Sequence, residues 1–186
     1  MKNDLFSDRL NDPSMLTELS AYHLLWRTED DTRLFAARLA ASLLTLSASD
    51  STFITLEGDL GAGKTTFVRY LLQAMGVTGR IKSPTYTVVE SYDIVSPALP
   101  KVARNLWHFD FYRFNDPHEW EEAGFRDIFA SPGYKLAEWP EKAAAELPIA
   151  DIAILIVADA DESRRVSVRA QTPAGQQLVQ DLTLSK

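Results

Sequence analysis

The apolar positions of this chain recur at two spacings, one typical of helices and one typical of strands. Between 32 and 46 they fall three or four residues apart, which predicts a helix, and Thr28 followed by three acidic residues predicts its N-terminal cap. Further helices are predicted at 65–75, near 117–123, at 141–147, and from about 173 onward. Alternating and β-branched runs predict an edge strand at 22–27 and strands at 52–57, 86–92, 106–111, 134–138, 151–158 and 166–170.

Strands and helices that interleave along one chain predict an α/β layer structure around a single core. The length of 186 residues suits one domain. We therefore expect a single domain over 21–186, preceded by an N-terminal extension of residues 1–20 with at most one short helix at 13–22. The proline-containing stretch 96–100 predicts a loop.

A glycine-rich segment joins the strand at 52–57 to the helix at 65–75 and matches the pattern G-x-x-x-x-G-K-[ST]. Its glycines allow backbone amides to point inward around the β- and γ-phosphates of a nucleotide, and Lys64 adds a positive charge. Thr65 is the expected Mg²⁺ ligand, and Thr66 is placed to donate toward the α-phosphate. The segment consists of Gly58, Asp59, Leu60, Gly61, Ala62, Gly63, Lys64, Thr65 and Thr66. The chain is therefore expected to bind ATP with Mg²⁺.

A nucleotide site of this kind also needs a carboxylate near the metal, usually at the end of a strand. Asp110 ends the predicted strand at 106–111, and Glu138 ends the one at 134–138. Both remain candidates, because the sequence does not show which of them lies closer to Thr65. The expected fold is P-loop NTPase-like, with a central, mostly parallel mixed β-sheet flanked by helices.

The composition of the chain excludes several kinds of chemistry and several classes of protein. The chain has no cysteine, which excludes disulfides, thiol catalysis and cysteine-bound metals. The formal net charge is −7, and an acidic chain is repelled on average by the phosphates of nucleic acid. If nucleic acid is bound, a partner protein is therefore expected to make most of the contacts. No secretory signal is evident, and no apolar run approaches the roughly 20 residues that span a bilayer. The chain lacks the guanine-reading motifs of GTPases, which favours ATP. Arg164 and Arg165 are interpreted as a surface pair, so no arginine within the chain is expected to act on the γ-phosphate.

Four segments together resemble the TsaE family, the ATPases of bacterial tRNA threonylcarbamoyladenosine biosynthesis. They are 58–66, 82–86, 108–113 and 138–140, and the resemblance covers roughly 27–170. It implies a cytoplasmic ATPase that hydrolyses ATP slowly alone and sustains turnover of the partner proteins TsaD and TsaB. Contact with tRNA would be indirect, through that complex, and no membrane would be involved.

The resemblance also implies roles for individual residues. Thr65 and Glu138 would hold the metal, and Asp110 would take a Walker B-like place, with Lys64, Asp110 and Glu138 forming the catalytic set. The segment 83–85, which includes Thr85, would act as a switch near the γ-phosphate. Residues expected to line the nucleotide are Glu29 and Thr32, near the adenine or ribose, and Trp139. His108 is expected to be structural.

Two alternatives remain open from the residues alone. One is a small-molecule phosphotransferase, which would need an acceptor pocket and a closing lid. The other is a nucleotide-dependent binding module, in which hydrolysis would be incidental.

Overall fold

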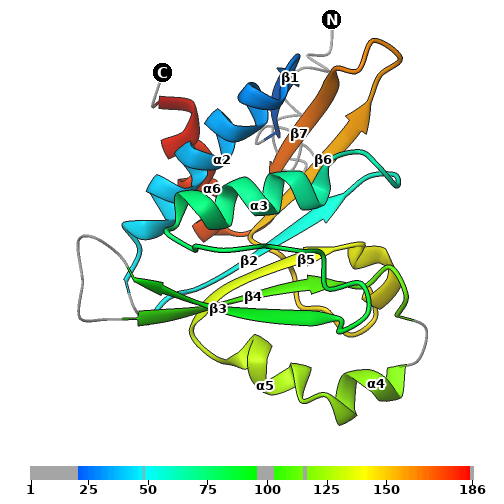
Figure 1. The fold of residues 1–186 in the computed structure, drawn as a ribbon. Helices are drawn as coiled ribbons and strands as arrows, with labels where there is room; N and C mark the ends of the chain where they lie inside the picture. The colour runs from blue at the N-terminus through cyan, green and yellow to red at the C-terminus, as the bar shows by residue number, and fades with distance from the viewer. Residues whose placement is uncertain (1–20, 48, 96–102, 115–116, 185–186) are drawn as a thin grey trace, which may run out of the picture.

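The computed structural model describes residues 21–47, 49–95, 103–114 and 117–184, and within them seven strands form one sheet (Figure 1). The strands lie in the order β1-β7-β6-β2-β5-β4-β3. Their bounds are β1 (Ala21–Trp26), β2 (Ser51–Glu57), β3 (Val89–Val95), β4 (Ala103–Asp110), β5 (Gly133–Glu138), β6 (Ile152–Ala158) and β7 (Arg164–Ala170). The helices are α2 (Glu29–Leu44), α3 (Lys64–Ala74), α4 (Pro117–Glu122), α5 (Phe125–Ala130), α6 (Pro173–Leu184) and the 3₁₀ helix η2 (Pro140–Ala143).

The sheet is parallel at its centre and antiparallel at its edges. Strands β6, β2, β5 and β4 run parallel, whereas β7 and β1 on one side and β3 on the other run antiparallel to their neighbours. The predicted α/β class is confirmed, and β1 is the edge strand that the sequence indicated. The carboxyl ends of the central strands meet at one edge of the sheet, where α/β proteins usually bind their ligands.

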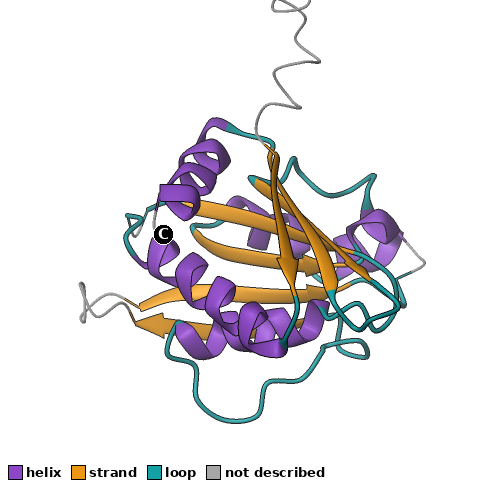
Figure 2. Cartoon of the chain, turned by 90° about the horizontal axis from the view of Figure 1, so that it is seen from above, coloured by secondary structure: helices purple, strands orange, loops and turns teal. Residues whose placement is uncertain are grey.

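Helices cover both faces of the sheet, as Figures 1 and 2 show. Helices α2, α3 and α6 lie on one face over a large aliphatic core that includes Leu39, Leu71 and Leu178. Helices α4 and α5 lie on the other face over a smaller core in which aromatic rings predominate. In that second core the rings of Phe109 and Phe125 pack edge to face with centroids 5.2 Å apart. None of the helices in the described ranges is long and apolar enough to cross a membrane.

Helix α2 begins as predicted. The Thr28 side chain accepts a hydrogen bond from the Asp31 amide at 3.3 Å, and the Asp31 carboxylate accepts one from the Thr28 amide at 2.9 Å. This reciprocal pair is a capping box and satisfies two amides at the helix start. The buried face of the helix follows the predicted spacing and consists of Thr32, Phe35, Ala36, Leu39, Ala40 and Leu43.

Two expected elements differ from the structure, and one helix was not predicted. The strand expected at 86–92 begins only at Val89, because Val88 has a positive φ of 64° and donates its amide to Pro84 O. The helix expected at 141–147 is wrong: only 140–143 form a 3₁₀ helix, and Pro148 disfavours helical geometry at Leu147. Helix α5 was missed, although its apolar residues have helical spacing. The predictions for 1–20 and 96–100 lie outside the described residues.

Candidate functional site

The glycine-rich segment between β2 and α3 makes a turn whose positive φ angles favour glycine at three positions: Gly58, Gly61 and Gly63. Gly58 and Gly63 have φ angles of 135° and 113°, which side chains of L-residues rarely adopt. A Cβ atom on Gly58 would lie 2.2 Å from the Ile156 carbonyl oxygen in β6. The loop is therefore held against the sheet at a distance that excludes any side chain at position 58.

Helix α3 starts directly from this loop and presents its N-terminus to it. Gly63 is the N-cap residue, and among the described residues no side chain caps the helix. Its first amides are therefore available to an anion, and the helix dipole adds positive potential at the same place. This geometry suits the phosphate binding that the sequence motif predicts.

Lys64, in the first turn of α3, is folded back over the loop. Its ammonium donates to Gly58 O at 2.6 Å and to Asp59 O at 3.0 Å, and it lies 3.7 Å from the centre of the Trp139 ring. The residue is only 4% exposed. Burial lowers the pKa of the ammonium, while the nearby carboxylate of Glu138 opposes that shift. A positive charge is thus kept beside the phosphate loop, with an aromatic ring over it.

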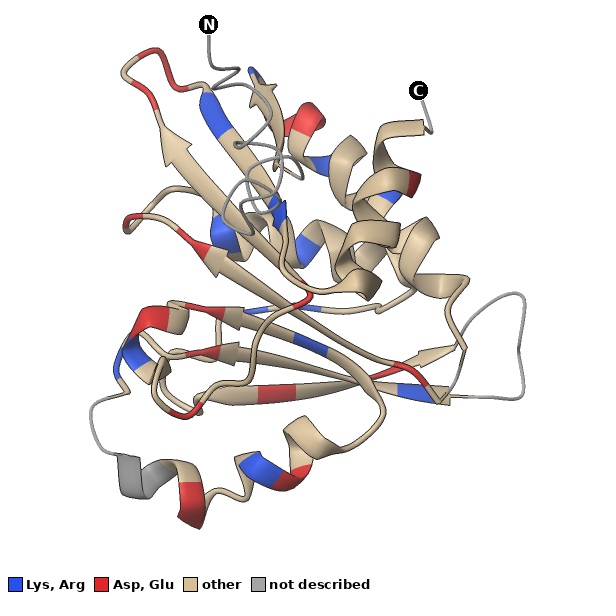
Figure 3. Cartoon of the chain, turned by 180° about the vertical axis from the view of Figure 1, so that it is seen from behind, with Lys and Arg blue, Asp and Glu red and all other residues tan. Residues whose placement is uncertain are grey.

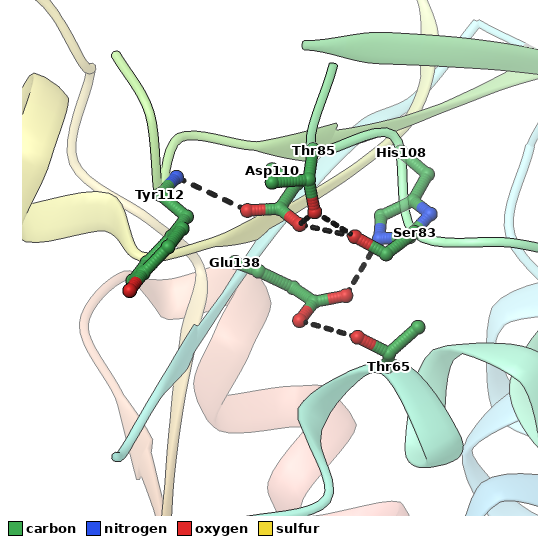
Figure 4. Close-up of polar contacts among 7 residues, drawn as sticks. All are labelled: Thr65, Ser83, Thr85, His108, Asp110, Tyr112 and Glu138. Carbon is green, nitrogen blue, oxygen red and sulfur yellow. Dashed lines mark hydrogen bonds and ion pairs between the residues drawn. The ribbon is translucent and has the colours of Figure 1, made fainter. Parts of the chain in front are cut away.

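Glu138 lies at the end of β5 and directly contacts the start of α3 (Figure 4). Its Oε2 accepts a hydrogen bond from the Thr65 hydroxyl at 2.9 Å, and its Oε1 lies 2.9 Å from Nε2 of His108 in β4. Both Glu138 and His108 are buried. The contact with His108, which was expected to be structural, restrains the orientation of the Glu138 carboxylate. The alternation of inward and outward side chains along β4 did not indicate that His108 contacts Glu138.

Asp110, at the end of β4, holds a different part of the site. Its Oδ2 accepts hydrogen bonds from Ser83 and, at 2.6 Å, from Thr85, and its Oδ1 accepts the Tyr112 amide at 3.0 Å. The amide of Asp110 donates to Val88 O at 2.9 Å. Within the described residues its hydrogen bonds therefore secure the segment 83–88 to the sheet. Glu138, not Asp110, is the acid that contacts Thr65.

The oxygen atoms around Thr65 fit a magnesium ion. Mg²⁺ prefers hard oxygen ligands and usually takes one or two from the protein, with water and phosphate oxygens completing its shell. The Thr65 hydroxyl and the Glu138 carboxylate supply such a pair. Within the described residues there is no cluster of three or more His, Asp or Glu side chains that could hold a metal by itself. The residues therefore suit a metal shared with a bound phosphate.

A pocket of about 350 Å³ opens on the Gly63 side of the loop. That volume is in the range of small-molecule pockets. Glu29 and Thr32 line it, and their place near the adenine or ribose stays a prediction; Tyr70 donates a hydrogen bond to the Glu29 carboxylate. Arg164 from β7 lines it as well, although the sequence indicated only a surface pair at 164–165. The complete lining is Trp26, Arg27, Thr28, Glu29, Thr32, Gly61, Ala62, Gly63, Thr66, Glu162 and Arg164.

Comparisons with known proteins agree with one another. The family described as "Threonylcarbamoyl adenosine biosynthesis protein TsaE" matches residues 26–166. A Haemophilus influenzae protein named tRNA threonylcarbamoyladenosine biosynthesis protein TsaE is 41% identical over 145 residues, covering 78% of this chain and 87% of that protein. The Bacillus subtilis protein of the same name is 32% identical over 160 residues, covering 86% and 94%.

A solved structure gives the same relationship in three dimensions. The crystal structure of YdiB from Bacillus subtilis superposes with a TM-score of 0.67 at 26% sequence identity, and the match covers 88% of this chain and 95% of that one. The expected resemblance is thus confirmed by sequence and by fold, and the chain belongs to the TsaE family.

Proposed function

We propose that this protein binds MgATP at the loop 58–65 and hydrolyses it, as the ATP-dependent component of tRNA threonylcarbamoyladenosine biosynthesis. The contact between the Thr65 hydroxyl and the Glu138 carboxylate, at 2.9 Å beside the buried Lys64, carries the proposal. This contact supports the proposal because the two oxygens that would bind Mg²⁺ lie next to a buried cation and to a loop whose amides would bind phosphate. The names of the relatives support the pathway.

In the proposed reaction a water oxygen attacks the γ-phosphorus in line, and the bridging oxygen leaves with ADP. Lys64 exchanges its bonds to Gly58 O and Asp59 O for bonds to phosphate oxygens, where it neutralises developing charge. A bound Mg²⁺, held by Thr65 and Glu138, would polarise the phosphate oxygens. Glu138 orients water in this environment, and its bond from His108 keeps the carboxylate in place.

In the proposed mechanism Asp110 acts indirectly, by holding the segment 83–85 in place. Ser83 and Thr85 both donate to its carboxylate, so the position of 83–85 depends on Asp110. A switch near the γ-phosphate would exchange one of those bonds when the phosphate arrives or leaves. Asp110 is therefore a positioning residue, and Glu138 is the catalytic carboxylate.

The proposed partners are TsaD and TsaB homologues, with tRNA reached through them. The net charge of −7 supports an indirect role, because phosphates of tRNA are repelled on average by an acidic surface. A groove of about 600 Å³ beside the loop, lined by Asp59, Trp139, Glu141 and Ile149 among others, offers space for a partner close to the reacting phosphate.

The test is ATP hydrolysis by the wild type, by Lys64→Ala and by the exposed control Lys142→Ala, each alone and with TsaD, TsaB and tRNA. We expect the wild type and Lys142→Ala to hydrolyse ATP slowly by themselves and faster with the partners. Lys64→Ala should lose both the slow and the stimulated hydrolysis. A rate of ATP hydrolysis that does not change when the partners are added would contradict the proposed role with TsaD and TsaB. Hydrolysis that persists in Lys64→Ala would contradict the proposed site.

A further inference from the structure

The groove of about 600 Å³ beside the phosphate loop shares no lining residue with the pocket of about 350 Å³ on the other side of the loop. Residues of β2 and β6, including Leu155, form one part of the groove, and the segment 139–150 between β5 and β6 forms most of the rest. Gly58 and Asp59 belong both to the groove and to the phosphate loop. A molecule in the groove therefore contacts the loop that the proposed function assigns to ATP.

Ile149 lines this groove and is 76% exposed, although the backbone around it is fixed. Leu147 packs against the aromatic core, and Ala150 is buried within that core. The Asp151 amide donates to Phe53 O at 2.8 Å, and Asp151 Oδ2 accepts the Phe53 amide at 2.9 Å, which ties the end of the segment to β2. The folded segment thus presents Ile149 outward at a defined place, together with the other apolar groups that line the groove.

Carboxylates line the same groove, and two of them are without a cation. Glu57 pairs with Arg169 at 3.5 Å. Asp59 and Glu141 are exposed, and among the described residues no Lys, Arg or His nitrogen lies within 4.0 Å of either carboxylate. Acidic residues also gather more widely at the carboxyl ends of the central strands (Figure 3). A complementary occupant is therefore basic as well as apolar.

We propose that this groove docks a partner protein through a segment that carries an apolar side chain next to lysine or arginine. The apolar group packs on Ile149, and the cation lies near both Asp59 and Glu141. This inference rests on the proposed function, because it assigns the surface through which this chain meets its partners. RNA is disfavoured as the occupant, since the same carboxylates repel its phosphates. A second copy of this chain, with a net charge of −7, is disfavoured for the same reason.

The groove is connected to the reacting group by contacts that the structure already contains. Trp139 lines the groove, and its ring centre lies 3.7 Å from the Lys64 ammonium. The same ammonium donates to Asp59 O at 3.0 Å. Burial lowers the pKa of Lys64, and the carboxylates of Glu138 and Glu141 oppose that shift, so Glu141 acts on the lysine electrostatically. Docking in the groove is therefore expected to change the rate of ATP hydrolysis.

The experiment measures binding of the full chain to the TsaD–TsaB pair by biolayer interferometry, with Mg²⁺ and a non-hydrolysable ATP analogue present. The variants are Ile149→Asp and Glu141→Lys. Their matched controls are Leu34→Asp, at a 61% exposed residue of α2, and Glu122→Lys, at an exposed residue of α4, neither of which lines the groove. Circular dichroism and calorimetry of ADP binding verify the fold and the nucleotide site of each variant.

We expect Ile149→Asp to raise the Kd for the pair about tenfold or more, because an apolar anchor at the centre of an interface is replaced by a charge. Glu141→Lys should raise it about fivefold, because a like charge then faces the cation of the partner. Both controls should stay within twofold of the wild type.

Several results would overturn the inference while leaving the proposed function in place. They are binding by folded Ile149→Asp or Glu141→Lys within twofold of the wild type, and equal weakening by the matched control. Light scattering that shows a wild-type dimer and a monomer for Ile149→Asp would assign the groove to a second copy, and affinity for tRNA alone that falls in Ile149→Asp would assign it to RNA. If the wild type itself does not bind the TsaD–TsaB pair, the proposed partnership fails, and the inference fails with it.

Discussion

Lys135 is a buried cation in the middle of β5, and its environment makes the stability of this protein depend on pH in a predictable direction. The side chain is 0% exposed, and its ammonium donates to Ser51 Oγ at 2.9 Å and to Ser131 O. Burial lowers the pKa of Lys135 from 10.5 to about 8. Each pKa unit corresponds to about 1.4 kcal/mol, so the charged form costs the folded state about 3 kcal/mol relative to an unfolded lysine.

The sign of the effect follows from proton binding. Well below pH 8 the lysine is protonated in both states, and the penalty is fully present. Between about pH 8 and 10.5 the folded protein releases the proton while the unfolded chain retains it, so the free energy of unfolding rises with pH. In Lys135→Met this contribution is absent. The variant should gain stability over the wild type at pH 7, reduced by roughly 1 kcal/mol for each lost hydrogen bond, and should lose its advantage as pH approaches 10.5.

Urea unfolding at pH 7, 8, 9 and 10, followed by circular dichroism, measures this difference. Subtracting the wild-type profile from that of Lys135→Met cancels the other titrating groups, and the exposed Lys142→Met serves as control. The difference between Lys135→Met and the wild type should fall by about 2–3 kcal/mol across the range, and that for Lys142→Met should stay level. A constant difference for Lys135→Met would refute the reasoning, because the ammonium would then be as well solvated in the folded protein as in the unfolded chain.

Two further predictions concern the site itself. Replacing Glu138 by Gln should lower ATP hydrolysis about 100-fold while ADP binding stays within a few-fold, and the exposed control Glu122→Gln should change neither. A Glu138→Gln variant that keeps partner binding and modification activity without turnover would favour a binding module over an ATPase. Replacing Gly58 by Ala should abolish nucleotide binding and lower Tm, because its Cβ would meet Ile156 O at 2.2 Å. Gly61→Ala meets no atom within 4 Å and is strained only by its φ of 82°, so it should bind nucleotide more tightly than Gly58→Ala. Equal binding by the two glycine variants, measured by calorimetry, would contradict the close packing of the loop on β6.

The sequence predicted those parts of the site that are contiguous in the chain. The loop 58–65 has its geometry encoded locally, since its glycines, its lysine and the helix that follows occur within a few residues. The cap and spacing of α2 are local as well. The choice between Asp110 and Glu138 was not predictable, because both end neighbouring strands and stand opposite each other in the register of β4 and β5. Only three-dimensional packing places Thr65 beside one of them.

The position of Arg164 in the pocket was not predictable for the same physical reason. The pocket that it lines is formed by segments far apart in the chain, which meet because β1 pairs with β7. Nothing in the pair Arg164–Arg165 indicates that one side chain faces the loop and the other pairs with Asp159. The alternation of side chains along a strand separates them, and their surroundings are set by the fold.

The position of β2 in the sheet has a consequence for the synthesis of this protein on the ribosome. Both neighbours of β2 in the sheet, β5 and β6, follow it in the chain, and β5 is complete only about 80 residues after β2 ends. At roughly 5–20 residues per second the strand waits on the order of 4–16 s for its first partner. During that time Phe53, Ile54 and Leu56, all buried in the finished fold, have no sheet to join. A nascent chain that already contains the whole loop 58–65 therefore leaves these apolar side chains exposed, and the loop reaches its final surroundings only after most of the chain has been translated.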